Sequence, residues 1–133
     1  MKVVLQRVSS AQVQIDGAVV GQIRTGVLLL LGVAPDDDQA KADWLVEKIL
    51  ALRIFPNPED ASLKSTMQLG LEESNGEALV VSQFTLFADV AKGRRPSFTG
   101  AAEPELAIQL YEYFVHKLSA RVAVQTGRFG PDM

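Results

Sequence analysis

The segment from Val27 to Val33, which reads Val-Leu-Leu-Leu-Leu-Gly-Val, contains no polar side chain. A short run that is apolar on both of its faces is typical of a central strand that is covered above and below its sheet. This run constrains the fold more than any other feature, because the rest of the chain must supply the neighbouring strands and the covering elements. We therefore expect a central strand at 27–33.

The residues before this run predict a β-hairpin. Residues 3–8 mix apolar and polar side chains, Val13 and Ile15 alternate with Gln12 and Gln14, and Asp16-Gly17 is a strong signal for a two-residue hairpin turn. Residues 18–23 then return as the second strand. We expect one long first strand, up to Asp16, paired with this second strand.

Two later segments show the periodicity of amphipathic helices. The first follows Pro35-Asp36-Asp37-Asp38, whose acidic side chains suit the positive end of a helix, and the prolines at 56 and 58 end it. The second begins near Pro104, since proline suits the first turn of a helix. The expected apolar stripes are Ala42, Leu45, Val46, Ile49 and Leu52 in the first helix, and Leu106, Ala107, Leu110, Tyr111, Phe114, Val115 and Leu118 in the second.

No metal site is expected in this chain. Asp36, Asp37 and Asp38 are consecutive acids without partner residues, which is more typical of a solvated helix start than of a cation site. The chain has no cysteine and one histidine, which excludes disulfides, thiolate metal sites and multi-histidine metal sites.

The composition bounds the class of protein. A chain of 133 residues with 47% hydrophobic residues suits one domain over residues 1–133. No apolar run approaches the roughly 20 residues that cross a bilayer, and the lack of cysteine suits a reducing cytoplasm. The net charge of −3 argues against a nucleic-acid binder driven by overall charge, although a local basic patch stays compatible with it. The expected fold is α/β, with a mixed, largely antiparallel sheet or barrel-like core and two main helices packed on it.

A polar stretch, Ser82-Gln83-Phe84-Thr85-Leu86, follows the apolar run from 78 to 81 and predicts a strand with a polar end. Buried hydroxyls and amides cost about 1–3 kcal/mol each when they have no partner. Two interpretations remain open from the residues alone: Ser82 and Thr85 bond to neighbouring backbone, or they face a ligand. A further strand is expected at 121–126.

The segment from 88 to 102 is rich in cations and is expected to be a loop. Lys92, Arg94 and Arg95 lie close together, Gly93 gives the backbone freedom, and Phe98 is an aromatic residue with an exposed position. A solvated turn is one interpretation. The other is a phosphate-binding loop with Phe98 near an RNA base or sugar.

These motifs, taken in their order, resemble the D-aminoacyl-tRNA deacylase family, also called D-tyrosyl-tRNA deacylases. The resemblance covers essentially the whole chain, and the residues that carry it are Leu5-Gln6-Arg7-Val8, Leu30-Leu31-Gly32-Val33, Arg53-Ile54-Phe55, Ser82-Gln83-Phe84-Thr85-Leu86, the segment from Lys92 to Phe98, and Gln125-Thr126-Gly127-Arg128-Phe129-Gly130. It implies a cytoplasmic homodimer, without a cofactor, that hydrolyses the ester between a D-amino acid or glycine and the terminal ribose of tRNA.

The resemblance also implies roles for individual residues. Ser82, Gln83, Phe84 and Thr85 are expected to form the catalytic pocket, and the main-chain amides of Phe84 or Thr85 could serve as an oxyanion hole. The residues expected to bind the aminoacyl-tRNA are Arg7, Lys92, Arg95, Pro96, Ser97, Phe98, Phe129 and Met133. The tRNA's own 2′-hydroxyl is expected to take part in the reaction.

Two alternatives stay open beside an editing hydrolase. A general esterase would use Thr85 as its nucleophile, but no local base accompanies it, and His116 lies on a predicted helix. A catalytically impaired homologue or RNA-end binder is the second alternative. It arises because family members carry an Asn-x-Gly-Pro-Val-Thr motif near the C-terminus, whereas this sequence ends at Met133 before any such motif. We expect the last strand to be missing, and we do not assign the chiral-rejection role of that motif to Gly130-Pro131.

Overall fold

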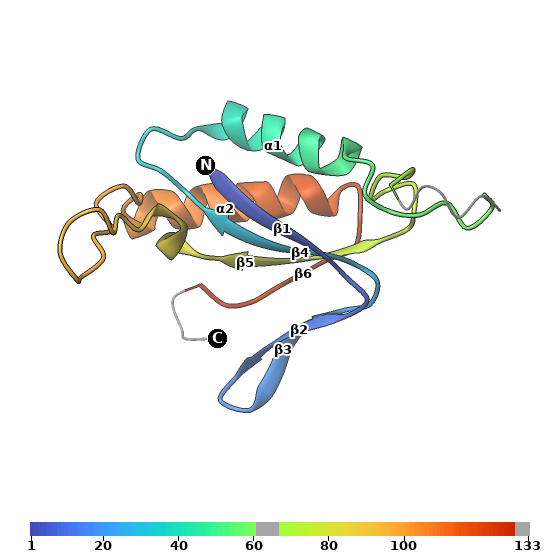
Figure 1. Ribbon diagram of the computed structural model, residues 1–133, viewed down its shortest axis with the longest axis horizontal. Helices are drawn as coiled ribbons and strands as arrows, with labels where there is room; N and C mark the ends of the chain where they lie inside the picture. The colour runs from blue at the N-terminus through green and yellow to red at the C-terminus, as the bar shows by residue number, and fades with distance from the viewer. Residues whose placement is uncertain (61–66, 130–133) are drawn as a thin grey trace.

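The apolar run forms β4 (Gly26–Gly32), an inner strand of the four-stranded sheet in the computed structural model, which describes residues 1–60 and 67–129 (Figure 1). The strand order is β1-β4-β5-β6, with β1 at Lys2–Val8, β5 at Glu77–Ser82 and β6 at Val124–Thr126. β1 is antiparallel to β4, whereas β5 is parallel to both β4 and β6. The prediction of a central strand is therefore confirmed, although the strand expected at 121–126 is shorter.

The predicted long first strand is instead two strands in two sheets. β1 ends at Val8, and β2 (Ala11–Ile15) pairs with β3 (Ala18–Ile23) in a separate antiparallel hairpin. The break falls at Ser9 and Ser10, which are exposed, so no buried side chain keeps the chain in the first sheet there. The hairpin turn is confirmed, because Asp16 and Gly17 have φ values of 50° and 79°, the left-handed backbone that a two-residue turn of this kind requires.

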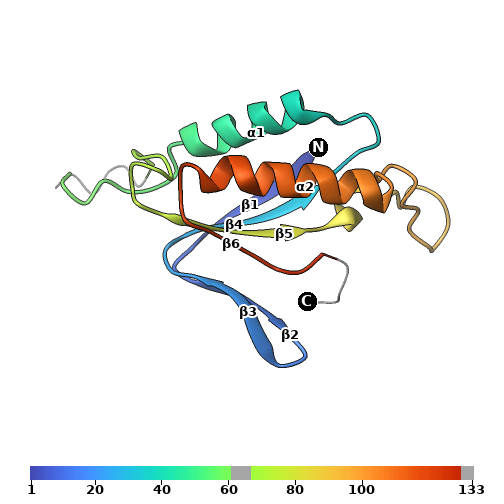
Figure 2. The ribbon, with the colours of Figure 1, turned by 180° about the vertical axis from the view of Figure 1, so that it is seen from behind.

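Two helices cover one face of the four-stranded sheet, as Figures 1 and 2 show from opposite sides. α1 (Gln39–Ala51) follows Asp38, whose side chain accepts a hydrogen bond from the Lys41 amide, and α2 (Pro104–Ser119) has proline in its first turn. Among the described residues, neither helix is long and apolar enough to span a membrane. The predicted stripe is wrong at Leu52, which caps α1 and is 38% exposed. The main core contains Val27, Leu29, Leu31, Val46, Ile49, Phe55, Val80, Phe114 and Leu118.

Asp37 does not belong to a solvated helix start, because its side chain is buried. Its carboxylate accepts hydrogen bonds of 2.7 Å from the α-ammonium group of Met1 and of 2.7 Å from the Ala34 main-chain N–H. Asp36 and Asp38 are exposed, as expected. The acidic turn therefore ties the start of β1 to the start of α1.

The β2–β3 hairpin lies on the face of the sheet that the helices leave open (Figure 1). Val13, Ile15 and Ile23 pack there against Leu79 and Val81 of β5. The α/β class with two helices is confirmed. Among the residues that the structure describes, however, two strand pairings are antiparallel and two are parallel, and the sheets are not closed into a barrel, because β2 and β3 form a separate two-stranded sheet.

Candidate active site

A cavity of about 900 Å³ lies at the carboxyl ends of β4 and β5. In open α/β sheets, ligands bind most often at the carboxyl ends of parallel strands. Its lining comes from β2, β4, β5, the segment that follows β5, and the start of α2. Much of this lining is apolar, including Val13, Leu30, Val81, Ala102 and Ala107.

The polar stretch after β5 forms one wall of this cavity. Ser82 is the last residue of β5 and pairs with Leu31 of β4, and the Gln83 main-chain N–H donates to the Leu31 carbonyl at 2.8 Å. The strand does not continue to Leu86 as predicted, since η1 (Phe84–Phe87) is a short 3-10 helix. This turn brings Ser82, Gln83 and Phe84 to the cavity.

Thr85 lies beside the cavity without lining it, and its hydroxyl accepts a hydrogen bond from the Gln83 side-chain amide. No buried side-chain nitrogen or oxygen in the described part of the chain lacks a partner. The Thr85 hydroxyl thus bonds to a side chain, whereas the first interpretation expected neighbouring backbone. Ser82, which is only half-buried, lines the cavity, which is the position that the second interpretation requires.

Two of the aromatic rings in the cavity lining contact each other. Phe84 and Phe98 contact each other edge to face, with ring centroids 5.1 Å apart and an interplanar angle of 70°. Phe84 is 57% exposed and Phe98 is 37% exposed, so each ring leaves much of its surface to solvent or to a ligand. Exposed aromatic faces are the usual platforms on which single-stranded bases stack.

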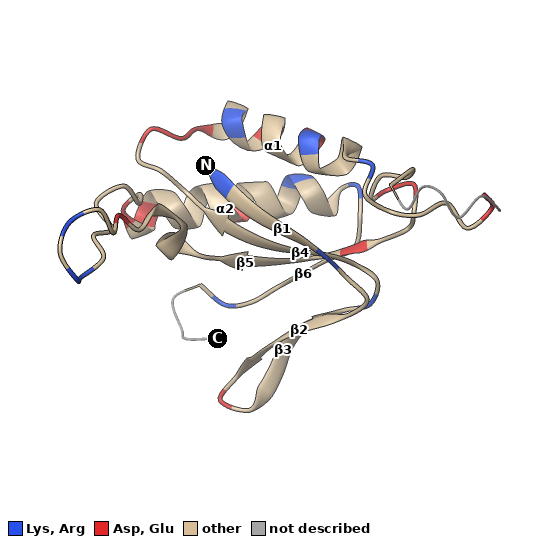
Figure 3. Cartoon of the chain, viewed as in Figure 1, with Lys and Arg blue, Asp and Glu red and all other residues tan. Residues whose placement is uncertain are grey.

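The basic loop, residues 89–97, begins and ends at a pair of hydrogen bonds between Asp89 and Ser97. The Asp89 N–H donates to the Ser97 carbonyl at 2.7 Å, and the Ser97 N–H donates to the Asp89 carbonyl at 2.8 Å. Gly93 has a φ of 67°, which allows the tight turn at the tip. The cartoon in Figure 3 is blue, the colour of Lys and Arg, at the tip of this loop. Lys92, Arg94, Arg95 and Pro96 are exposed, and none of them lines the cavity.

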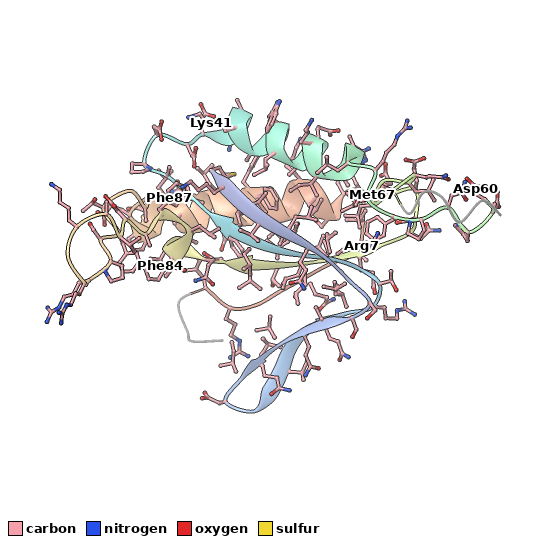
Figure 4. All side chains as sticks on the ribbon, viewed as in Figure 1. Arg7, Lys41, Asp60, Met67, Phe84 and Phe87 are labelled. Carbon is pink, nitrogen blue, oxygen red and sulfur yellow. The ribbon has the colours of Figure 1, made fainter. Side chains whose placement is uncertain are left out.

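The structure does not bring Arg7 to this site. Arg7 pairs with Val27 at the start of β4, whereas Ser82 pairs with Leu31, four positions further along the same strand. Four positions correspond to about 13 Å along a strand. The guanidinium of Arg7 donates to the Ile54 carbonyl at 2.7 Å, and Figure 4 shows Arg7 and Phe84 well separated.

Phe129 does line the cavity and contacts Tyr111, with ring centroids 6.1 Å apart. The Tyr111 hydroxyl donates to the Val80 carbonyl at 2.9 Å. Burial raises the pKa of Tyr111 to about 12, and a hydrogen bond with Thr126 partly opposes that shift. Tyr111 is therefore a neutral phenol at pH 7 and supports the wall behind Phe129. Met133, the remaining predicted site residue, lies outside the described residues.

Sequence reasoning missed several residues of the cavity lining. Gln12 and Gln14 line it from β2, and Glu103 and Pro104 line it from the start of α2. The alternation of glutamines with Val13 and Ile15 indicated a strand, but nothing local shows which other element a strand will face. Glu103 is the one charged residue in the lining among the residues described.

Among the described residues, the Glu103 carboxylate is the one group in the lining that could act as a base, and it lies at the exposed start of α2. His116 lies on the exposed side of α2 and is not part of the cavity. Within residues 1–60 and 67–129, no group of three or more His, Cys, Asp or Glu side chains could hold a metal ion. The site can position a substrate through hydroxyl, amide and aromatic groups.

Comparisons with known proteins cover nearly the whole chain. A model of the D-Tyr-tRNA(Tyr) deacylase family matches residues 4–133. A solved structure described as "c-Myc DNA Unwinding Element Binding Protein" is 33% identical, with a TM-score of 0.89 over 99% of this chain and 87% of that chain. Another, described as a probable eukaryotic D-amino acid tRNA deacylase, is 20% identical, with a TM-score of 0.81 over 98% of this chain and 89% of that chain. The last similarity shows the fold alone.

Proposed function

Because the chain belongs to the D-Tyr-tRNA(Tyr) deacylase family, we propose that it hydrolyses the ester that joins a D-amino acid, or glycine, to the terminal ribose of tRNA. The products are the free amino acid and free tRNA, and cytoplasmic tRNA is the expected pool of substrate. The observation that carries this proposal is the position of Ser82, Gln83 and Phe84 on the wall of a cavity of about 900 Å³. A cavity of this size suits an aminoacylated nucleoside.

In the proposed reaction, the RNA contributes the 2′-hydroxyl of its terminal ribose. Water adds its oxygen to the ester carbonyl carbon and gives one proton to the 2′-oxygen. The bond from that carbon to the ribose 3′-oxygen breaks, and the 2′-hydroxyl passes its own proton to the departing 3′-oxygen. The main-chain amides of Phe84 or Thr85 stabilise the negative charge that develops on the carbonyl oxygen. The lack of a histidine in the lining supports this division of roles.

Outside the cavity, the basic loop is proposed to hold the RNA backbone. Lys92 and Arg95 are exposed and contact phosphates, and Phe98 and Phe84 take the terminal base or its sugar. Ser97 fixes the base of the loop through its two main-chain hydrogen bonds to Asp89, and Pro96 stiffens the same arm.

The protein is proposed to act as a homodimer with its active sites near the subunit interface. Val4 is 48% exposed and pairs in register with Leu30, which lines the cavity, so the two side chains form an apolar strip on the open face of the sheet. A second copy would cover that strip. Sedimentation as a monomer at micromolar concentration would contradict this part of the proposal.

A second candidate function is binding of a nucleic-acid end without hydrolysis. It is favoured by the 33% identity to the structure described as a DNA unwinding element binding protein. The cavity and the basic loop serve either function, so only an assay of the ester separates them.

The decisive assay incubates the protein with D-Tyr-tRNA and L-Tyr-tRNA and follows loss of each ester. Loss of the D-ester alone supports the hydrolase. Loss of neither ester, with tRNA or DNA binding retained, supports the second candidate. A D-Tyr-tRNA with a 2′-deoxy terminal adenosine is expected to react at least about 100-fold more slowly; equal rates would exclude the proposed role of the 2′-hydroxyl. Thr85→Ala is expected to stay active, because Thr85 does not line the cavity.

A further inference from the structure

The segment η1, which carries the amides of Phe84 and Thr85, contacts two residues to which the proposed reaction assigns no role: Lys2, which lies outside the cavity lining, and Gly32, which lines the cavity without a side chain. We propose that Lys2 and Gly32 are positioning residues that fix the distance between η1 and the end of β4. This inference rests on the proposed hydrolase function, and it assigns Lys2 a role other than RNA binding.

The sheet places these two residues together. β1 and β4 are antiparallel, so the start of β1 meets the end of β4, and Lys2 pairs directly with Gly32. The end of β4 is also where the cavity lies. Lys2 and Gly32 therefore form a single surface beneath η1, named here the η1 seat.

Gly32 allows η1 to approach β4 closely. A Cβ atom at this position would lie 2.9 Å from Cε2 of Phe87, 3.2 Å from the Gln83 carbonyl oxygen and 3.2 Å from Cβ of Leu86. The first distance is shorter than real Cβ contacts, and the other two atoms lie on the same segment. A side chain at Gly32 must therefore move the Phe87 ring, and it also presses against the Gln83 carbonyl and Leu86 Cβ.

Lys2 holds the other end of the same segment. Its ammonium group lies 3.4 Å from the Leu86 carbonyl, to which it donates, and 4.8 Å from the centre of the Phe87 ring. At the opposite end of the segment, the Gln83 N–H donates to the Leu31 carbonyl at 2.8 Å. η1 is thus fixed at its start by β4 and at its end by β1. Figure 4 shows Phe84 and Phe87 lying at the same end of the sheet.

The seat matters for the reaction because an oxyanion hole works only at the right distance from the carbonyl oxygen. Misplacement of a site by about 1 Å can lower the rate about 100-fold. Loss of the seat moves the amides of Phe84 and Thr85, but it leaves the basic loop tip and its cations unchanged. The expected consequence is a lower kcat with little change in KM.

Lys2→Met tests the proposal, with Lys2→Arg as the conservative variant and Lys48→Met as a matched control on an exposed part of α1. For hydrolysis of D-Tyr-tRNA, Lys2→Met is expected to lower kcat about three- to tenfold, leave KM and its salt dependence unchanged, and be rescued by arginine. Lys48→Met is expected to match the wild type. A raised KM with a weaker salt dependence would instead make Lys2 a phosphate contact and overturn the proposal.

Amide hydrogen exchange tests the seat even if the protein hydrolyses nothing. The Leu86 and Ala88 amides donate to the carbonyls of Gln83 and Thr85, so they are expected to be protected in the wild type. Faster exchange at these two amides in Lys2→Met and in Gly32→Ala, with unchanged exchange in β5, supports the seat. Unchanged exchange in both variants overturns it, and absence of hydrolysis by the wild type alone overturns only the proposed function.

Discussion

Removal of the two cations proposed to hold phosphate gives the sharpest test of the basic loop. The variant is Lys92→Ala with Arg95→Ala. Both side chains are exposed, and no ion pair found among the described residues involves either of them. Surface substitutions of this kind change the free energy of unfolding by about 0.5 kcal/mol or less. The melting temperature should therefore stay close to that of the wild type, and any loss of affinity reports on binding.

The expected size of the effect follows from counterion release. For single-stranded RNA, each phosphate contact contributes about 0.7 to the slope of log affinity against log salt concentration, so two contacts contribute about 1.4. Between 50 and 200 mM salt, these two contacts should then account for about a sevenfold loss of wild-type affinity that the double variant does not show. The net charge of −3 adds no general attraction, so the local cations must supply this term.

The assay is fluorescence anisotropy with a tRNA acceptor minihelix that carries a non-hydrolysable D-aminoacyl amide at its 3′ end. The matched control is Lys48→Ala with Arg53→Ala, which also removes one lysine and one arginine at exposed positions outside the cavity lining. If both double variants lower the salt slope equally, the effect is one of net charge. If neither lowers it, the loop does not contact phosphate, and the reasoning is refuted.

Three further predictions concern single side chains. Phe98→Ala removes a stacking surface and should raise the KM for D-aminoacyl-tRNA about tenfold, measured under initial-rate conditions, with kcat nearly unchanged. Asp37→Ala leaves the Met1 ammonium group without its buried partner and should lower the free energy of unfolding by about 3 kcal/mol in urea titrations; a loss below 1 kcal/mol would mean that water satisfies the charge. Tyr111→Phe should cost about 1 kcal/mol at pH 7 through its lost hydrogen bond. Since the folded-state pKa of Tyr111 is raised to about 12, wild-type stability should fall between pH 10 and 12 as the unfolded chain loses the phenolic proton first, and the Tyr111→Phe protein should show a smaller fall.

Short sequence motifs predicted where helices, strands and turns occur in this fold better than they predicted which strands pair with each other. The left-handed turn at Asp16 and Gly17 was predictable because two residues determine it, and the capping by Asp38 depends on one turn of helix. The break at Ser9 and Ser10 was not predictable from alternation, since the pattern of apolar residues continues on both sides of it. β1 and β2 belong to different sheets, and contacts with strands distant in the sequence determine which sheet each of them joins.

The candidate site also combines residues that local sequence predicts with residues that only the folded arrangement brings together. Ser82, Gln83 and Phe84 were predictable because polar residues at the end of an apolar strand need a reason to be there, and the family resemblance supplied one. Arg7, which was predicted to bind tRNA, lies four positions away along β4, because its place in a motif carries no information on which end of the sheet it occupies. Gln12, Gln14 and Glu103 were missed because they reach the cavity from β2 and from α2, elements that meet β5 only after folding.

The distribution of charge separates binding from chemistry in this molecule. The cations of the basic loop lie outside a cavity whose lining is apolar or neutral, apart from Glu103. A largely apolar lining strengthens the hydrogen bonds that main-chain amides offer to a developing oxyanion. In the proposed reaction, an RNA held by its backbone at the loop brings its ester to η1 and its own 2′-hydroxyl with it. The rate then depends on how firmly η1 is held, so Lys2 and Gly32, at the pairing of β1 with β4, should both affect hydrolysis.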